Sequence, residues 1–152
     1  DRAEGCKDAL KNAGLDDKFG RNMSSGDYTH QSGYVAMNDL LKRMPEIDGV
    51  FVANDQMAVG ALKALSEKGK KIPEDVKVIG YDNVFISSIL EPSLSTVHVR
   101  KRHIGLEAVT MLLNRMEDDT PRDGEAVVME TKVVVRKSTS KNAIEDWILA
   151  DW

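Results

Sequence analysis

The sequence predicts an α/β fold in which an open, mostly parallel sheet is flanked by helices. Two short apolar runs, residues 49–53 and 76–81, each end in polar residues, Asn54-Asp55 and Asp82-Asn83. Residues 56–68, with a helical pattern, lie between them. A β-rich run, a helix and another β-rich run form a βαβ unit with parallel strands. Because ligands of such sheets bind at the carboxyl ends of the strands, these polar residues mark a candidate site for a small polar ligand.

The bulk composition is that of a soluble globular protein. The chain has 152 residues, enough for one compact domain, with 41% hydrophobic and 30% charged residues. A net charge of -4 argues against a self-sufficient nucleic-acid binder, which is usually basic. The one cysteine, Cys6, excludes an internal disulfide and suits a reducing compartment. No apolar run has membrane-spanning length, no signal peptide is visible, and the absence of an initial Met suggests a processed or truncated chain.

The N-terminal part predicts two helices joined by a loop. Apolar spacing predicts the first helix over residues 2–13, and Gly14 is a plausible stop. Residues 15–27 are polar and rich in Gly and Ser, which predicts a loop with room for a short strand. Thr29 is a candidate N-cap for the second helix, and Pro45 lies just past its end. The apolar face of the second helix is formed by Tyr34, Met37, Leu41 and Met44.

The central part predicts the βαβ unit in detail. Residues 50–53 are entirely apolar, as expected of a strand covered by helices on both sheet faces. Asn54 or Asp55 caps the next helix, with Asp55 favoured as the structural cap, and Gly69 ends it. Residues 72–80 supply a turn and then the second strand. The inward face of the helix is formed by Ala58, Ala61, Leu62 and Leu65.

The C-terminal part predicts shorter elements. Residues 86–90 have the pattern of one helical turn, and residues 94–99 are extended. Residues 118–124 predict an exposed turn, and residues 127–136 are strongly β-prone. The tail, residues 141–152, has room for a short helix through Ile144, Trp147 and Ile148. A longer helix precedes the turn, with apolar positions Ile104, Ala108, Met111, Leu112 and Met116.

Five short motifs follow one another along the chain: residues 2–5 (RAEG), 52–60 (VANDQMAVG), 72–83 (IPEDVKVIGYDN), 92–97 (PSLSTV) with the helix over 105–112, and 135–139 (VRKST). Each motif alone is weak, but five in the right order with the right gaps are specific. This order of segments resembles the effector-binding core of the lac repressor family of bacterial transcription regulators, which is related to periplasmic sugar-binding proteins. The resemblance covers roughly residues 1 to 140.

The resemblance implies the C-terminal subdomain of a periplasmic-binding-protein-like type I fold, with a ligand cleft between two subdomains. Residues 1–95 would form most of this subdomain, without its first strand. Residues 96–125 would be a crossover and a helix of the N-terminal subdomain, residues 126–140 a strand returning to the first subdomain, and residues 141–152 a tail. The helix around residues 104–116 would then lack its natural packing partner, so we expect it to dock elsewhere or to be exchanged between chains.

The resemblance also implies four ligand-binding residues. Arg2 matches the family arginine that contacts effector, and its guanidinium forks onto paired oxygens. Asn54 offers a donor and an acceptor, and the carboxylate of Asp82 accepts two hydroxyl hydrogen bonds. Tyr28 stands where relatives carry an aromatic that lines the cleft. The structural alternatives are a solvated arginine, a helix cap, a turn residue and a helix-entry tyrosine, respectively.

Other candidate sites are poorer. Some relatives carry a glutamine where this chain has Val99, so the ligand of better-known relatives does not transfer. His30, His98 and His103 have no metal-ligand spacing, so neither a metal site nor a cofactor is predicted. Cys6 falls on the apolar helix face, which predicts a core thiol.

These observations predict a non-enzymatic, cytoplasmic sensor: the truncated effector core of a sugar-responsive transcriptional repressor. Its partners would be a sugar or sugar derivative, operator DNA through a headpiece absent from this chain, and a second copy in a homodimer, with no membrane contact. The alternative is a periplasmic sugar-binding protein of a transport system. An α/β enzyme is a third possibility that rests only on the strand-end carboxylates. By resemblance, candidate dimer contacts lie near Tyr34, Leu62, Ile86, Ile89 and Leu90.

Overall fold

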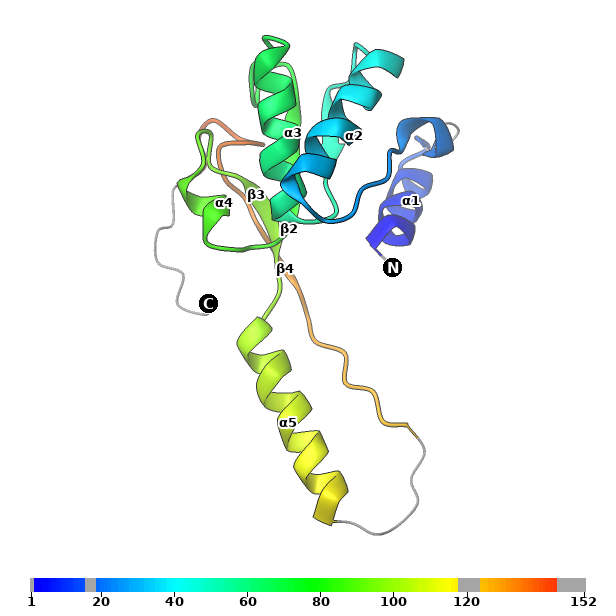
Figure 1. The fold of residues 1–152 in the computed structure, drawn as a ribbon, viewed down its shortest axis with the longest axis vertical. Coiled ribbons are helices and arrows are strands. Elements are labelled where there is room, and N and C mark those ends of the chain that lie inside the picture. Colours follow the sequence, from blue (N-terminus) through cyan, green and yellow to red (C-terminus); the bar gives the residue numbers. More distant parts are fainter. Residues whose placement is uncertain (1, 16–18, 118–123, 145–152) are drawn as a thin grey trace.

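A computed structural model describes residues 2–15, 19–117 and 124–144 (Figure 1). One four-stranded sheet has the order β1-β2-β3-β4, and β1, β2 and β3 are parallel while β4 is antiparallel to β3. This confirms the predicted open, mostly parallel sheet. Its strands are β1 (Gly49–Phe51), β2 (Lys77–Asp82), β3 (Ser95–His98) and β4 (Lys132–Val134). The helices are α1 (Arg2–Asn12), α2 (His30–Arg43), α3 (Asp55–Glu67), α4 (Ile86–Ile89) and α5 (Lys101–Glu117), with a 3-10 helix η1 (Phe19–Asn22).

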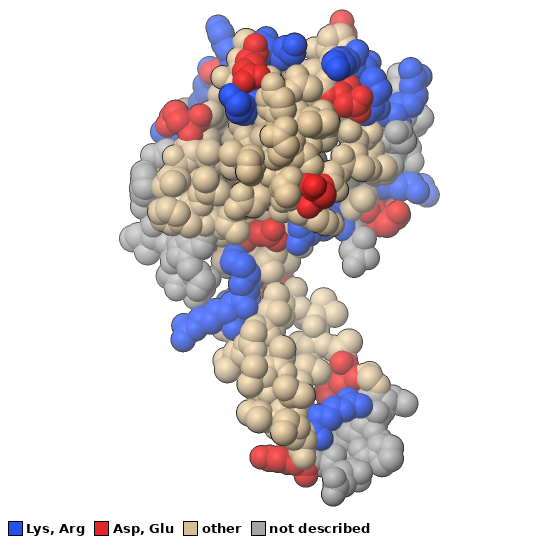
Figure 2. Space-filling view, viewed as in Figure 1, with Lys and Arg blue, Asp and Glu red and all other residues tan. Residues whose placement is uncertain are grey.

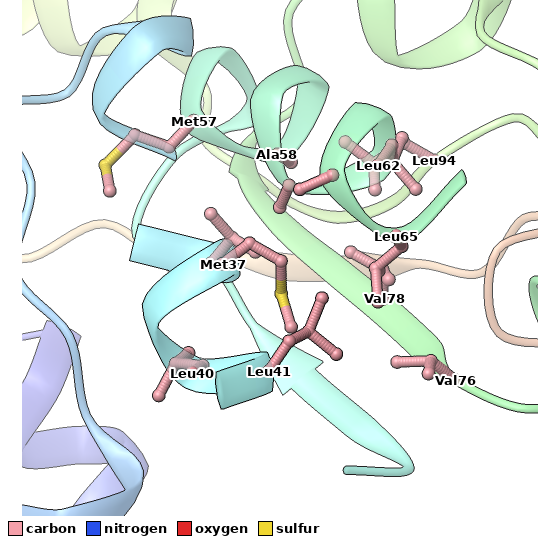
Figure 3. Packing of buried hydrophobic residues seen from close by; sticks show 13 residues of the cluster. Met37, Leu40, Leu41, Met57, Ala58, Leu62, Leu65, Val76, Val78 and Leu94 are labelled. Carbon is pink, nitrogen blue, oxygen red and sulfur yellow. The ribbon is translucent and has the colours of Figure 1, made fainter. Parts of the chain in front are cut away.

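The core lies where α2 and α3 pack on each other and on β2. Met37 and Leu41 of α2 are buried as the spacing predicts, whereas Tyr34 and Met44 are half-buried at the edge of this cluster. All four positions predicted for the inward face of α3 are buried. Figure 3 shows the central cluster, which includes Met37, Leu40, Leu41, Leu62, Leu65, Val76, Val78 and Leu94.

Two glycines set the distance between α2 and α3. A Cβ atom at Gly33 of α2 would overlap the backbone of Met57, and one at Gly60 of α3 would overlap the carbonyl oxygen of His30. Each helix therefore places a glycine against the backbone of the other. The close approach requires the absence of a side chain at both positions.

The predicted helix ends are confirmed. Thr29 caps α2 by accepting a hydrogen bond from Ser32 N at 3.2 Å. Gly14 and Gly69, after α1 and α3, both have a φ of 70°, the left-handed conformation that glycine adopts without strain. Between Gly14 and Thr29, the described residues hold a 3-10 helix in place of the short strand for which the loop left room.

The strand β1 is less buried than the sequence predicts. Val50 and Phe51 are half-buried, and Val52, just after the strand, is the buried residue of this run. The reason is position, because β1 lies at the edge of the sheet and has β2 as its only strand neighbour in the described structure.

The β-prone run over residues 127–136 is also shorter as a strand than its composition indicates. Only Lys132–Val134 pair with β3, between Thr96 and His98. Beyond His98 the chain turns into α5, so residues 127–131 have no ladder to join. The predicted turn over 118–124 and tail helix over 141–152 lie largely outside the described residues, including Trp147 and Ile148; Ile144 is exposed.

The predicted long helix is present as α5 and extends away from the body (Figure 1). No residue of α5 is buried, and most of the described surface of this projection carries no charge (Figure 2). Its docking or exchange stays a prediction, because the structure contains one chain. Within the described ranges, the helices lack the combination of length and apolar character that a membrane span requires. The exposed apolar side chains of α5 are Ile104, Leu106, Val109, Leu112, Leu113 and Met116.

Candidate functional site

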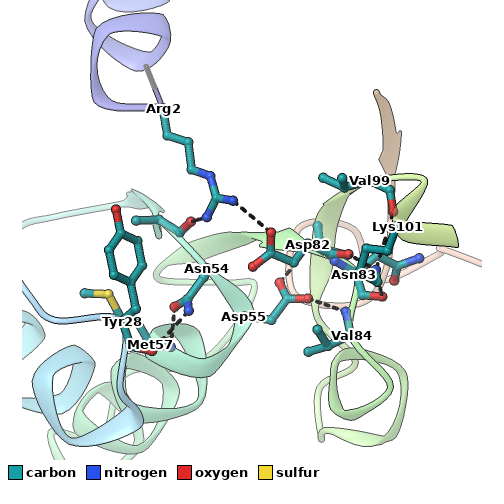
Figure 4. Close-up of polar contacts among 12 residues, drawn as sticks. Arg2, Tyr28, Asn54, Asp55, Met57, Asp82, Asn83, Val84, Val99 and Lys101 are labelled. Carbon is teal, nitrogen blue, oxygen red and sulfur yellow. Dashed lines mark hydrogen bonds and ion pairs between the residues drawn. The ribbon is translucent and has the colours of Figure 1, made fainter. Parts of the chain in front are cut away.

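Arg2 and Asp82 meet at the carboxyl ends of β1 and β2 (Figure 4). Arg2 projects from the start of α1, and its Nη2 lies 3.0 Å from Oδ1 of Asp82. Its Nη1 donates to the carbonyl oxygen of Ala53, just after β1, at 2.6 Å. Both side chains remain partly open to solvent, at 35% and 26% exposed. Because both groups are partly exposed, the guanidinium can donate hydrogen bonds to a polar ligand and the carboxylate can accept them.

Tyr81 completes this group and was not predicted from the sequence. The guanidinium of Arg2 lies 4.1 Å from the centre of the Tyr81 ring, in cation–π geometry. Tyr81 directly precedes Asp82 at the end of β2. Aromatic residues are common in β-strands. The sequence therefore contains no local signal that distinguishes this tyrosine as part of a site.

Asn54 is the N-cap of α3. Its Oδ1 accepts from Met57 N at 2.9 Å, and its Nδ2 donates to the carbonyl oxygen of Tyr28 at 3.0 Å. The expected capping role is thus present, and the same side chain holds the backbone of Tyr28, which has a φ of 68°. The Tyr28 side chain is 60% exposed and lies with Asn54 near Arg2 (Figure 4). All four predicted ligand residues thus lie at one edge of the sheet.

Asp55 is not the cap that the sequence favours. It is fully buried, its Oδ1 accepts from Thr96 Oγ1 at 2.7 Å, and its Oδ2 accepts from Val84 N at 2.8 Å. A Cβ atom at Gly80 would overlap Oδ1 of Asp55, so the glycine in β2 leaves the space for this carboxyl group. Asp55 therefore connects α3 to β3 and to the chain after β2.

Arg136 lies at the centre of the same buried polar network. It is 2% exposed, and its Nη1 donates to Ser87 Oγ at 3.1 Å and to the carbonyl oxygen of Leu94 at 2.9 Å. Its Nη2 donates to Asn83 Oδ1 at 2.9 Å. The network ties the C-terminal segment to the turn that follows Asp82. Sequence analysis missed this role, since a lone arginine after a β-prone run is usually exposed.

Burial raises the pKa of the Asp55 carboxyl above its ordinary value of 3.8, against the opposing effect of hydrogen bonds from Thr96 and Val84. The folded chain thus holds this proton more tightly than the unfolded chain. As the pH rises from 3.8 through the folded pKa, the carboxyl contributes progressively less to the free energy of unfolding. We expect the free energy of urea unfolding of the wild type to fall relative to that of Asp55→Asn as the pH rises above 3.8 through the folded pKa. The raised pKa of Asp55 would be contradicted if the free energy of unfolding of the wild type, relative to that of Asp55→Asn, stayed constant or increased over this rise in pH.

A cavity of about 290 Å³ lies beside the site, at the foot of α5. Val99 is one of the lining residues, and its apolar side chain offers no hydrogen-bonding group to the cavity. Tyr81 lines this cavity and also contacts Arg2, so the cavity and the Arg2–Asp82 pair share this residue. The remaining lining residues are Arg100, Ile104, Val127, Met129, Glu130 and Thr131.

Two other sequence-based expectations concern reactive or metal-binding groups. Cys6 is half-buried on α1, a helix with no buried residue, so the predicted core thiol is wrong. Burial raises the pKa of this thiol. In the part of the chain that the structure describes, no group of three or more His, Cys, Asp or Glu side chains is arranged to hold a metal ion.

Comparison with known proteins identifies the family. Residues 1–139 match the family described as periplasmic binding protein-like domain. The chain belongs to this family. A relative in Thermobifida fusca, the HTH-type transcriptional regulator CelR, is 36% identical over 140 residues, which are 91% of this chain and 40% of the relative. The HTH-type transcriptional repressor PurR of Pasteurella multocida (strain Pm70) is 37% identical over 138 residues, 90% of this chain and 40% of that protein.

A solved structure supports the same assignment for this periplasmic binding protein-like chain. The structure of a transcriptional regulator CelR-cellobiose complex superposes with a TM-score of 0.85 and 37% identity, over 90% of this chain and 41% of the other. A protein of the LacI family from Sanguibacter keddieii DSM 10542 superposes with a TM-score of 0.81 and 36% identity, over 88% of this chain and 50% of the other. The resemblance to the lac repressor family, expected from five motifs, is confirmed. The chain spans less than half the length of the curated relatives it matches.

Proposed function

We propose that this chain is part of the effector-binding core of a cytoplasmic, DNA-binding transcriptional repressor. The observation that carries the proposal is the Arg2–Asp82 pair over Tyr81, at the strand ends of a chain whose relatives are transcription regulators. The relatives are regulators and not enzymes, which favours a non-enzymatic sensor over the enzyme alternative. The same relatives disfavour the alternative of a periplasmic sugar-binding protein of a transport system.

The ligand we propose is a sugar or sugar derivative. Asp82 would accept hydroxyl hydrogen bonds, Arg2 would fork onto paired oxygens, and the remaining amide hydrogen of Asn54 would donate. The exposed ring of Tyr28 would stack on the apolar face of the ring sugar. The cellobiose in the related structure has the hydroxyl-rich chemistry that these groups would recognise.

Effector binding would alter the affinity for operator DNA only if the ligand binds two conformations unequally. DNA contact would require a headpiece, and a two-fold operator would require a dimer. The exposed side chains of Val35 on α2, Ile89 on α4 and Phe85, which directly precedes α4, are candidates for the dimer surface. Leu62, expected at that surface, is buried in the core of the single chain.

The test is sugar binding by the intact protein. In a thermal-shift screen of mono- and disaccharides that includes cellobiose, we expect at least one sugar to raise the melting temperature. Titration calorimetry should then show that Asp82→Asn lowers the affinity for that sugar by roughly ten- to a hundred-fold, because a charged hydrogen-bond acceptor is lost. Asp8→Asn, an exposed site on α1, removes the same charge and serves as the control. No stabilising sugar, or equal affinity for Asp82→Asn, would refute the proposal.

A further inference from the structure

Lys101, the first residue of α5, contacts the turn that carries Asp82. Its Nζ donates to the carbonyl oxygen of Asp82 at 2.5 Å and to that of Asn83 at 3.3 Å. It also lies 3.4 Å from the carbonyl oxygen of Val99, in the segment that leads from β3 to α5. One ammonium group therefore joins the end of β2, the end of β3 and the start of α5 (Figure 4).

The turn that Lys101 contacts has an uncommon backbone. Asp82 and Asn83 both have positive φ values, 100° and 51°, although neither is glycine. L-residues visit this region rarely, and a surrounding structure must hold them there. The direction in which the Asp82 carboxylate points depends on this backbone.

The body of the protein holds the amide hydrogens of the turn and the side chain of Asn83. Asn83 N donates to Thr96 Oγ1 at 3.2 Å, and Val84 N donates to Asp55 Oδ2 at 2.8 Å. In both contacts the turn donates an amide hydrogen, and a side-chain oxygen of the buried network accepts it. The outward carbonyl oxygens of Asp82 and Asn83 receive hydrogen bonds from Lys101 instead, and Lys101 belongs to a helix with no buried residue.

We propose that Lys101 is a positioning residue that couples the orientation of α5 to the ligand-binding carboxylate of Asp82. This inference rests on the proposed function, because it assigns a regulatory contact to the same site. When α5 is oriented as in the structure, Lys101 holds the two carbonyls and the carboxylate faces Arg2. When α5 reorients, the ammonium withdraws, the turn loses its outer support, and the carboxylate changes direction. A ligand held by Asp82 would therefore favour the orientation of α5 in which Lys101 makes its contacts.

The experiment measures sugar affinity by titration calorimetry, using the sugar that stabilises the wild type most in the screen that includes cellobiose. We expect Lys101→Met to weaken binding about ten-fold, because the outer hydrogen bonds to the turn are lost. Lys101→Arg keeps N–H donors and should restore the affinity to within about three-fold. Arg102→Met removes the same charge from an exposed neighbour on α5 and should change the affinity by less than about two-fold.

A second measurement separates positioning from a general structural effect. In the ligand-free protein, the carbonyl carbon NMR signals of Asp82 and Asn83 should shift in Lys101→Met and stay in place in Arg102→Met, with similar melting temperatures. Equal sugar affinity for the wild type and Lys101→Met would overturn the inference alone. An affinity loss without any shift of the two carbonyl signals would also overturn it. A wild type that binds no sugar would overturn the proposed function itself, whatever the carbonyl signals show.

Discussion

Replacing Arg136 by leucine is expected to lower the free energy of unfolding by about 3–5 kcal/mol, the range observed when one partner of a buried charged network is removed. The leucine side chain cannot donate to Ser87, to the carbonyl oxygen of Leu94 or to Asn83, all of which Arg136 contacts. Buried acceptors that lose their donor retain their desolvation cost. The buried Asp55 would also lose a nearby positive charge that lowers its pKa. Urea unfolding monitored by circular dichroism measures the change.

The control for Arg136→Leu is Lys63→Leu on the exposed face of α3. Lys63 forms an ion pair with Glu67 at 2.7 Å, one turn along the helix, and its side chain is 68% exposed. Because solvent screens this pair, its loss should leave the unfolding curve unchanged within error. A similar small change for Arg136→Leu would show that the buried network contributes little. The prediction would then be wrong.

Replacing Gly60 by alanine should lower the free energy of unfolding by about 3 kcal/mol, at the upper end of the cost of overpacking. The added methyl group would overlap the carbonyl oxygen of His30 and crowd Tyr34 N, which lies 2.5 Å from the Cβ position. These are backbone atoms of α2, so relief requires the two helices to move apart. That movement would open the core between Met37 and Leu65. Urea unfolding again provides the measurement.

The matched control is Gly105→Ala, a glycine-to-alanine change within α5. Among the described residues, apart from the adjoining residues and the nearby backbone of α5 itself, no heavy atom lies within 4 Å of the Cβ position at Gly105, so the methyl group has open space. Alanine should then stabilise the helix by up to about 1 kcal/mol through its higher helix propensity. The two substitutions are therefore expected to have opposite signs. A stabilising Gly60→Ala would contradict the close approach of α2 and α3.

Much of the fold was predictable because helix and strand patterns are local. The spacing of Met37 and Leu41 located the buried face of α2, and Thr29 located its start. The length of β4 was not predictable, because a strand also needs a partner and β3 ends at His98. Composition alone cannot show where the neighbouring strand stops.

The candidate site was predictable in part. The polar ends of β1 and β2 and the family motifs pointed to Arg2, Asn54 and Asp82, which lie at one edge of the sheet. The roles of the adjacent residues Asn54 and Asp55 were harder to assign. Both are good capping residues, so local propensity does not choose between them. The choice depends on the space at Gly80 and on the donors Thr96 and Val84.

The sequence by itself determined the order of the elements, the apolar faces of α2 and α3, and the edge of the sheet that carries the polar residues. These features follow from periodicity and from chain direction, which neighbouring residues specify. The tertiary structure decided that the Asp55 carboxylate points inward and the Asp82 carboxylate points toward Arg2, 80 positions away in the chain. It also decided that Lys101 reaches the carbonyl oxygen of Asp82, 19 positions away. Such contacts depend on the path of the whole chain, because each requires two distant segments to pack at one place.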